Sequence, residues 1–227
     1  MVEVSGPLAC FTRPELKAER VSYPVLTPSA AVGVLEAIFW KPEMSYVITA
    51  IEVLAPIEWM RLRRNEVKSV ISAAEVAALR WDPRRRYDVE TDRDQRNSML
   101  LRDVHYRIHA QIRLAPHAAG ESEQKYRDQL RRRVDRGSCF SEPYLGCREF
   151  TATFGPRTDA KPIDRDEDLG VMLHSITYAP SGAEQYQWFH AQLHRGVMRV
   201  PVTPLGADEV AMPVSSAWRT DGSRDGR

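Results

Sequence analysis

The most regular stretch of the sequence is Val104-His105-Tyr106-Arg107-Ile108-His109-Ala110-Gln111-Ile112-Arg113-Leu114, in which apolar and polar side chains alternate. A period of two predicts a β-strand with its apolar face in the core and its polar face exposed. The polar face carries His105, Arg107 and His109, whose imidazole and guanidinium groups suit contacts to phosphates and bases. Simple solvation of such a face is the commoner alternative, and the residues alone leave both open.

Helices are predicted on either side of this strand. Thr27 suits an N-cap because its hydroxyl can accept from a free backbone amide, and Pro28 suits the first helical position, so a helix is expected from there to the break near Pro42. A second helix is expected over residues 125–136, closed by a glycine, with one apolar face that recurs every fourth residue from Tyr126.

Shorter segments that are β-branched or alternate in polarity predict further strands. In chain order the elements are then strand, helix, strand, insertion, strand, helix and strand, which is the βαββαβ order of a ferredoxin-like (RRM-like) domain in the α+β class. Residues 65–100 carry many charges with little period, so we predict an inserted loop region with a short helix at residues 73–79. The further strands are expected at residues 2–4, 47–54, 57–63 and 148–154.

The chain is expected to divide into three parts. Residues 1–155 form the ferredoxin-like domain in this prediction. Residues 156–214 form a small C-terminal β-sheet appendage, with strands at residues 170–179 and 187–200. Residues 215–227 are polar and contain glycine, so a disordered tail is expected there.

The composition is that of a globular protein, with 43% hydrophobic and 28% charged residues. No apolar run approaches the roughly 20 residues that span a bilayer, so no membrane association is expected. The first residues lack the pattern of a secretory signal, and three widely spaced cysteines fit reduced thiols. We therefore expect a cytoplasmic protein, and the spacing of Cys139 and Cys147 predicts neither a zinc site nor another bound metal or cofactor.

Positive charge is concentrated locally although the net charge is only +1. Most charge clusters are solvated surfaces, but three arginine-rich segments favour an anionic partner such as a nucleic acid. These segments contain Arg61, Arg63, Arg64 and Lys68; Arg80, Arg84, Arg85 and Arg86; and Arg127, Arg131, Arg132, Arg133 and Arg136.

Several short strings are more particular than secondary-structure propensity requires. They are Ala9-Cys10-Phe11-Thr12-Arg13-Pro14-Glu15, Glu19-Arg20-Val21-Ser22-Tyr23-Pro24, Thr27-Pro28-Ser29-Ala30-Ala31, Ile38-Phe39-Trp40-Lys41-Pro42, Arg63-Arg64-Asn65-Glu66-Val67, Gln95-Arg96-Asn97, Pro143-Tyr144-Leu145-Gly146-Cys147-Arg148-Glu149-Phe150 and Leu169-Gly170-Val171-Met172-Leu173. Each string alone is a weak signal. As a set, from about Val2 to about Thr177, they closely resemble the subtype I-C (Dvulg) branch of the CRISPR-associated Cas-five family.

The resemblance implies an endoribonuclease that binds and cleaves the repeat hairpin of precursor CRISPR RNA without a metal ion. It also implies that the product ends in a 2′,3′-cyclic phosphate and that the protein keeps the 5′ handle within the surveillance complex, Cascade, beside the other subtype I-C subunits. Residues 1–155 would then be the RNA-binding and processing domain, with precursor and mature CRISPR RNA as partners. The arginine clusters could also bind DNA non-specifically.

Catalysis in this family is attributed to a tyrosine in an aromatic-Trp-Lys-Pro string and to a Lys-His pair at the start of the second helix. Here the first position is Phe39, which we expect to pack in the core, and the pair reads Lys125-Tyr126. Lys125 could stabilise the charge of the phosphate, while Tyr126 or His117 could transfer the proton. The predicted catalytic residues are therefore Lys125, Tyr126 and His117.

Two points stay open on the sequence alone. His105 and His109 are alternative proton acceptors and Tyr46 an alternative hydroxyl. A subunit that binds the 5′ handle without cutting it is the alternative function, since Phe39 and Tyr126 depart from the family pattern. In either case, contacts to RNA are predicted at Arg13, Arg20, Lys41, Arg63, Arg64, Arg107, Arg127, Arg131 and Arg148.

Overall fold

A strand of 22 residues, β5 (Arg93–Leu114), runs through the centre of the fold. The computed structural model describes residues 1–16 and 19–206, so the predicted tail at residues 215–227 lies outside the described residues. The alternating stretch of the sequence forms the second half of β5, as predicted. That half pairs with β1 (Val2–Ala9) on one side and with β3 (Met44–Val53) on the other.

The strands form one large, mainly antiparallel sheet in a mixed α/β protein with few helices. Along the sheet the order is β6-β1-β5-β3-β9-β8-β7, and the short β2 (Arg20–Val21) pairs in parallel with β5. The remaining strands of this path are β6 (Thr153–Gly155), β7 (Glu167–Tyr178), β8 (Glu184–His194) and β9 (Val197–Arg199). The predicted C-terminal strands are present. They continue the central sheet, because β9 pairs with β3.

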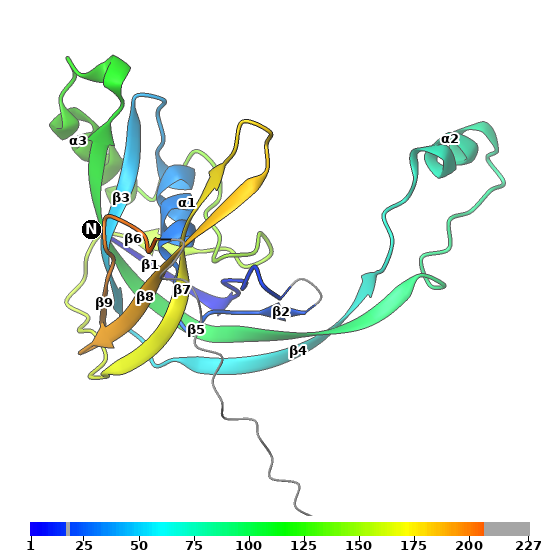
Figure 1. Cartoon of the computed structure of the whole chain (residues 1–227), viewed down its shortest axis with the longest axis horizontal. Helices are drawn as coiled ribbons and strands as arrows, with labels where there is room; N and C mark the ends of the chain where they lie inside the picture. Colours follow the sequence, from blue (N-terminus) through cyan, green and yellow to red (C-terminus); the bar gives the residue numbers. More distant parts are fainter. Residues whose placement is uncertain (17–18, 207–227) are drawn as a thin grey trace, which may run out of the picture.

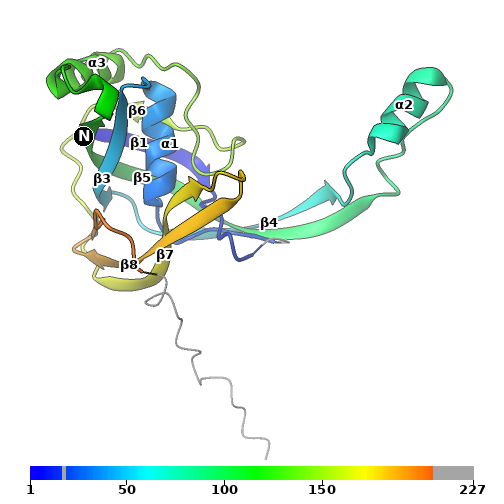
Figure 2. The same cartoon turned by 45° about the horizontal axis from the view of Figure 1, so that its top comes forward.

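Helix α1 (Pro28–Ile38) begins as predicted, since the Thr27 hydroxyl accepts a hydrogen bond from the amide of Ala30 at 3.2 Å. It packs on β3 on one side and on the β7 strand on the other, so the sheet curves around it (Figure 2). Its buried residues Ala31, Val34, Leu35 and Ile38 belong to a core cluster that also includes the apolar face of β5. Burial of such a side chain contributes roughly 2 kcal/mol.

Helix α3 (Glu123–Asp135) confirms the second predicted helix. It follows a short 3-10 helix, η1 (Pro116–Ala118), and its Ser122 side chain caps the first turn. Tyr126 and Val134 are buried against the sheet, and the positive φ of Gly137 ends the helix. None of the helices in the described part of the chain is long and apolar enough to cross a membrane.

The prediction for residues 65–100 is correct in part, because this insertion contains the helix expected at residues 73–79, but its two ends are strands and not loop. Strand β4 (Glu58–Val67) pairs with the first half of β5 over ten residues, and helix α2 (Ala73–Trp81) lies between the two strands. Together they form an arm that projects from the body of the molecule (Figure 1). Strand β4 alternates between half-buried and exposed residues, which agrees with the strand predicted at residues 57–63. Helix α2 and residues 93–97 of β5 bury no residue, so the sequence gives no apolar period there.

The strand predicted at residues 148–154 is confined to β6. Before it the chain turns back on itself, because the amide of Leu145 donates to the carbonyl of Phe150 and the amide of Phe150 donates to that of Cys147. Phe150 and Ala152 are buried, which produces the alternating pattern without an extended backbone.

Candidate functional site

At the start of α3, Lys125 and Tyr126 of its first turn form a cluster with Glu121, which precedes the helix. The Lys125 ammonium lies 2.6 Å from Oε2 of Glu121, and the Tyr126 hydroxyl donates to the same oxygen at 2.8 Å. Lys125 also lies over the Tyr126 ring, 5.3 Å from its centroid. Lys125 is 53% exposed whereas Tyr126 is buried. The cluster therefore presents the Lys125 cation to solvent above the buried ring of Tyr126.

These contacts fix the protonation of the cluster. Burial, followed by the hydrogen bond to Glu121, raises the pKa of Tyr126 to about 12. Hydrogen bonds from Lys125 and Tyr126 hold the pKa of Glu121 below its usual range. Near neutral pH Tyr126 is therefore a phenol and Glu121 a carboxylate. Tyr126 can donate a hydrogen bond there, but it is unsuited to accept a proton.

His117, the third predicted catalytic residue, lies on η1 and is exposed. Its side chain makes no hydrogen bond or ion pair within the described residues. The 3-10 helix is anchored by the buried Ala118, and the amide of Glu121 donates to the carbonyl of Ala118. One short segment thus carries His117, Glu121, Lys125 and Tyr126.

Phe39 packs in the core, as predicted, with 2% of its surface exposed. The Arg133 guanidinium lies 5.4 Å from the centroid of its ring and donates to the carbonyl of Ile38, which ties the end of α1 to α3. The Tyr46 hydroxyl donates to the carbonyl of Phe39 at 2.6 Å, and burial raises the pKa of Tyr46 above its usual range. Tyr46 is therefore engaged with the backbone.

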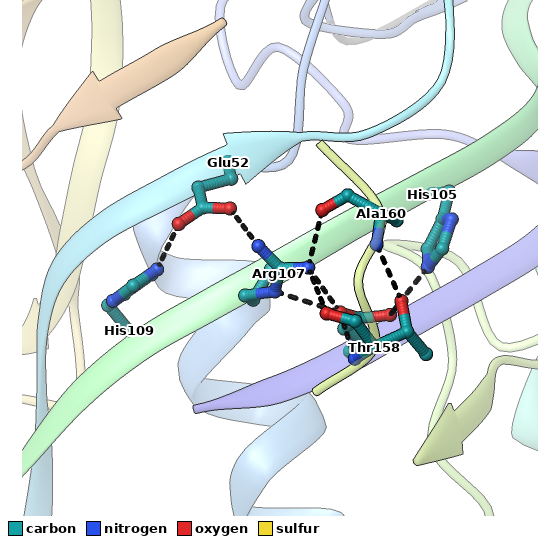
Figure 3. A network of polar contacts seen from close by, with 7 residues as sticks. Glu52, His105, Arg107, His109, Thr158 and Ala160 are labelled. Atoms are coloured by element: carbon teal, nitrogen blue, oxygen red, sulfur yellow. Dashed lines mark hydrogen bonds and ion pairs between the residues drawn. The ribbon is translucent and has the colours of Figure 1, made fainter. Parts of the chain in front are cut away.

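The polar face of β5 is only partly exposed, in contrast to the prediction: Gln111 and Arg113 are exposed and His105 and His109 are half-buried, but Arg107 is buried. Arg107 is 2% exposed and lies between Glu3 of β1 and Glu52 of β3, its direct cross-strand neighbours. Its Nε and Nη2 donate to Oε1 of Glu3 at 2.8 and 2.6 Å, and its Nη1 donates to Glu52. Arg107 is thus a structural residue and is unavailable to RNA (Figure 3).

The segment after β6 closes over this ion-pair network. Nη2 of Arg107 donates to the carbonyls of Thr158 and Ala160, and the Thr158 amide and hydroxyl both donate to Glu3. At the edges of the network, His105 lies 3.2 Å from Glu3 and His109 lies 2.7 Å from a carboxylate oxygen of Glu52 (Figure 3). Both histidines are therefore paired with carboxylates.

A second ionic cluster joins the base of the arm to the loop before β6. Glu149 accepts from Arg64 at 2.6 Å and from Arg20 at 3.1 Å. Glu66 lies 3.5 to 3.7 Å from Arg20, Arg64 and Arg96. Three arginines face two glutamates, so the cluster keeps an excess of positive charge although the predicted RNA contacts Arg20 and Arg64 are already paired.

The other predicted RNA contacts lie on several surfaces. Arg127 and Arg131 lie on α3, two and six residues after Lys125, and line a cavity of about 400 Å³ between α3 and the sheet. Arg148 lines a hollow with the exposed Trp40 and Phe140. Lys41, which follows Trp40, and Arg63, on the outer face of the arm, are exposed. The guanidinium of Arg13 lies 4.6 Å from the centroid of the Tyr23 ring.

A family model described as CRISPR-associated protein (Cas_Cas5), Cas_Cas5d, matches residues 1–224. The chain belongs to the Cas5d family. A relative from Mannheimia succiniciproducens, "CRISPR pre-crRNA endoribonuclease Cas5d", is 41% identical over 92% of this chain and 96% of its own. A relative with the same name from Thermus thermophilus is 40% identical over 88% of this chain and 90% of its own. A solved structure, "Crystal Structure of CRISPR-associated Protein", shares the fold at a TM-score of 0.62 and 21% identity, over 88% and 90% of the two chains.

Membership of the Cas5d family confirms the resemblance found in the sequence. The structure brings Lys125 and Tyr126 together with Glu121. Glu121 was not among the predicted site residues, although its spacing of four residues from Lys125 is typical of helical ion pairs. The sequence also gave no indication that Glu149 forms ion pairs with Arg20 and Arg64. No local signal could have found that residue, because its partner Arg64 is 85 residues away along the chain.

Proposed function

We propose that this protein is the subtype I-C endoribonuclease that binds the repeat hairpin of precursor CRISPR RNA and cleaves it in the cytoplasm. It then keeps the 5′ handle within the surveillance complex, beside the other subtype I-C subunits. One observation carries the proposal. Two relatives that are about 40% identical over roughly nine tenths of both chains are named CRISPR pre-crRNA endoribonuclease Cas5d.

The proposed reaction uses the RNA as its own nucleophile. A ribose 2′-hydroxyl attacks the adjacent phosphorus, the bond to the 5′ oxygen of the next nucleotide breaks, and the upstream product ends in a 2′,3′-cyclic phosphate. This route needs in-line geometry, a proton acceptor and positive charge beside the phosphate, and none of these requires a metal ion.

Each requirement has a candidate near the start of α3. The Lys125 ammonium, held by Glu121, supplies positive charge for the phosphate oxygens. His117 is the proton acceptor, because its imidazole is exposed on the same segment. Tyr126, which stays a phenol, positions Glu121 and thereby Lys125.

The RNA-binding unit comprises residues 1–155 and has a ferredoxin-like fold. Its support is the strand order β6-β1-β5-β3, in which the fourth strand of a βαββαβ unit lies beside the first, and the third beside the second. Residues 156–214, described as far as residue 206, are the C-terminal β region.

RNA would approach along the basic surface of α3 and the arm. Arg127 and Arg131 lie on the same helix as Lys125, and the ionic cluster at the base of the arm adds Arg20 and Arg64. Binding to phosphates releases counterions, so affinity should fall steeply with salt. The same surface would bind double-stranded DNA weakly and without sequence preference. The other proposed contacts are Arg13, Lys41, Arg63 and Arg148.

The test uses purified protein and repeat RNA in the presence of a chelator. One cut is expected, with a cyclic phosphate on the upstream product. Lys125→Ala should slow cleavage by about 100-fold or more while it changes RNA affinity only a few-fold. Lys161→Ala, which removes an exposed lysine between β6 and β7, is the matched control and should cut at the normal rate.

A binding subunit that does not cut is the second candidate. It is favoured by Phe39, which has no hydroxyl and lies in the core, and by the Tyr126 phenol, which is bound to Glu121. In that case the wild-type chain binds repeat RNA with nanomolar affinity and leaves it intact in every buffer. Phe39→Tyr then restores measurable cleavage if the missing hydroxyl is the only defect.

A further inference from the structure

Cys10 and Cys147 lie side by side although 137 residues separate them in the sequence. Cys10 follows the last residue of β1 and is buried, whereas Cys147 is half-buried in the loop before β6. The amide of Cys10 donates to the carbonyl of Leu145 at 3.0 Å, and the Cys147 thiol points at the carbonyl oxygen of Cys10, 3.7 Å away. Neither thiol takes part in the proposed RNA chemistry.

The backbone holds this pair together independently of the thiols. Gly146 has a φ of +85°, and a Cβ at this position would lie 2.0 Å from the carbonyl oxygen of Cys10. Only glycine permits so close an approach. The loop is therefore pressed against the end of β1, and the relative position of the two cysteines is fixed by the fold.

The surroundings of the pair give the two sulfurs different reactivity. The hydrogen bond from Cys10, with the positive charges of Arg20 and Arg64, lowers the pKa of Cys147 to about 7 against the opposing effects of burial and Glu149. The same hydrogen bond, followed by burial, raises the pKa of Cys10. Near neutral pH Cys147 is thus the nucleophilic, accessible sulfur and Cys10 is a protected thiol beside it.

We propose that Cys10 and Cys147 are an oxidation site, at which a hydroperoxide converts the two thiols into a reversible disulfide. In the first step the Cys147 thiolate attacks hydrogen peroxide. A sulfur–oxygen bond forms, the oxygen–oxygen bond breaks, and the hydroxide released takes up a proton as water, which leaves a sulfenic acid. In the second step the sulfur of Cys10 attacks the sulfur of Cys147, the sulfur–oxygen bond breaks, and hydroxide leaves with the Cys10 proton as water.

The electron balance of the two steps closes with one peroxide molecule. Each sulfur loses one electron and the peroxide gains two. The raised pKa of Cys10 does not block the second step, because its main cause is the hydrogen bond to the Cys147 sulfur, which changes once that sulfur is oxidised. Disulfides that form transiently in response to oxidants are the kind found in reducing compartments.

The disulfide would act on the base of the arm. Glu149, two residues after Cys147, binds Arg64 of β4 and Arg20 of β2, so the linked loop is the one that holds the arm to the body. The link would also close a chain segment of 137 residues, which restricts the unfolded state. The oxidised protein should therefore be the more heat-stable form.

The experiment uses the full chain with Cys139→Ser, because Cys139 is exposed and could form links between molecules. The reduced protein, which then has two thiols, is treated with hydrogen peroxide, and free thiols are counted after denaturation. We expect the thiols to disappear together, a mass loss of two hydrogen atoms, and a peptide that links Cys10 to Cys147 in a digest without reductant. A dithiol reductant should reverse all three changes, and oxidation should raise the Tm by roughly 5 °C or more.

Cys10→Ser in the same background is the matched control. Cys147 should then oxidise to sulfinic acid, since no neighbouring thiol captures the sulfenic acid. The inference is overturned if both thiols survive the treatment, if Cys147 reaches sulfinic acid while Cys10 is still present, or if the wild-type chain links Cys139 instead. It does not depend on RNA cleavage, because no step involves RNA.

Discussion

Arg107→Met is the substitution that tests the buried ion-pair network most directly. Met matches the length of the arginine stem and removes the guanidinium. Arg107 makes five hydrogen bonds, two to Glu3, one to Glu52 and one each to the carbonyls of Thr158 and Ala160. The variant leaves two carboxylates without their central cation, at sites where Glu3 is only 4% exposed.

The expected cost follows from this burial. Removal of one partner from a buried ion pair costs about 3–5 kcal/mol, because the charge left behind is neither solvated nor neutralised. For a chain of this size each kcal/mol shifts the Tm by roughly 2–4 °C. We therefore expect Arg107→Met to lower the Tm by about 10 °C at neutral pH, measured by circular dichroism or calorimetry.

The effect should depend on pH in a defined direction. Burial raises the pKa of Glu3, but hydrogen bonds from Thr158 and Arg107 outweigh it and hold the pKa below its usual range. In the wild type, Glu3 thus contributes stability that is present above its unfolded pKa and is lost as the pH falls through the folded value. Without Arg107, its hydrogen bonds and positive charge no longer lower the pKa of Glu3, so Glu3 takes up a proton more readily. The difference in Tm should therefore be largest near pH 7 and shrink towards about pH 4.5.

Arg102→Met is the matched control on the same strand. Arg102 forms a 2.6 Å ion pair with Glu58, but 53% of the Arg102 side chain is exposed, so solvent replaces the lost partner. We expect its Tm to change by about 1–2 °C at most. Equal effects of the two substitutions, or a deficit in Arg107→Met that does not shrink in acid, would refute the account of a buried network.

Three further predictions concern single positions. Gly146→Ala should destabilise the protein by about 3 kcal/mol or more, because the new Cβ would clash with the carbonyl of Cys10 and the backbone has a positive φ. Gly33→Ala in α1, where a Cβ meets nothing within 4 Å, should stabilise the protein by roughly 0.5–1 kcal/mol. Chemical denaturation measures both, and a tolerated alanine at Gly146 would contradict the close approach. Thr27→Ala should cost about 1 kcal/mol through the lost N-cap, and Thr27→Ser should retain most of that stability. When cleavage rates are measured from about pH 6 to pH 9, Tyr126→Phe should not shift the midpoint of the pH profile, because a phenol with a pKa of about 12 does not ionise in this range. A shifted midpoint would show that Tyr126 titrates during catalysis.

Local sequence patterns predicted most of the elements in the body of the protein. The alternation from residue 104 to residue 114, the Thr27-Pro28 helix start and the apolar face of α3 each reflect one buried face, and burial on one face imposes a period that the sequence records. The strands of the arm were predicted only in part. The strand predicted at residues 57–63 is part of β4, but residues 64–67 of β4 and residues 93–97 at the start of β5 bury no side chain and have no apolar face.

The sequence placed three of the candidate site residues close together because they are also close along the chain. Lys125, Tyr126 and His117 lie within one short segment, where sequence distance and spatial distance agree. The role of Tyr126 as a buried donor to Glu121 follows from packing and was not visible in the sequence. Arg107 was misassigned, because its exposure depends on which residues of β1 and β3 stand opposite it and on the segment that crosses it.

The sequence by itself determined the regular elements around β5 and the membership of the Cas5d family, since both are written in local periods and short strings. Only the tertiary structure decided the reach of the arm, the burial of Arg107 and the pairing of Cys10 with Cys147. The physical reason is strand register. It brings residues more than a hundred positions apart to within hydrogen-bonding distance, and no local pattern of hydrophobicity or charge encodes which of them will meet.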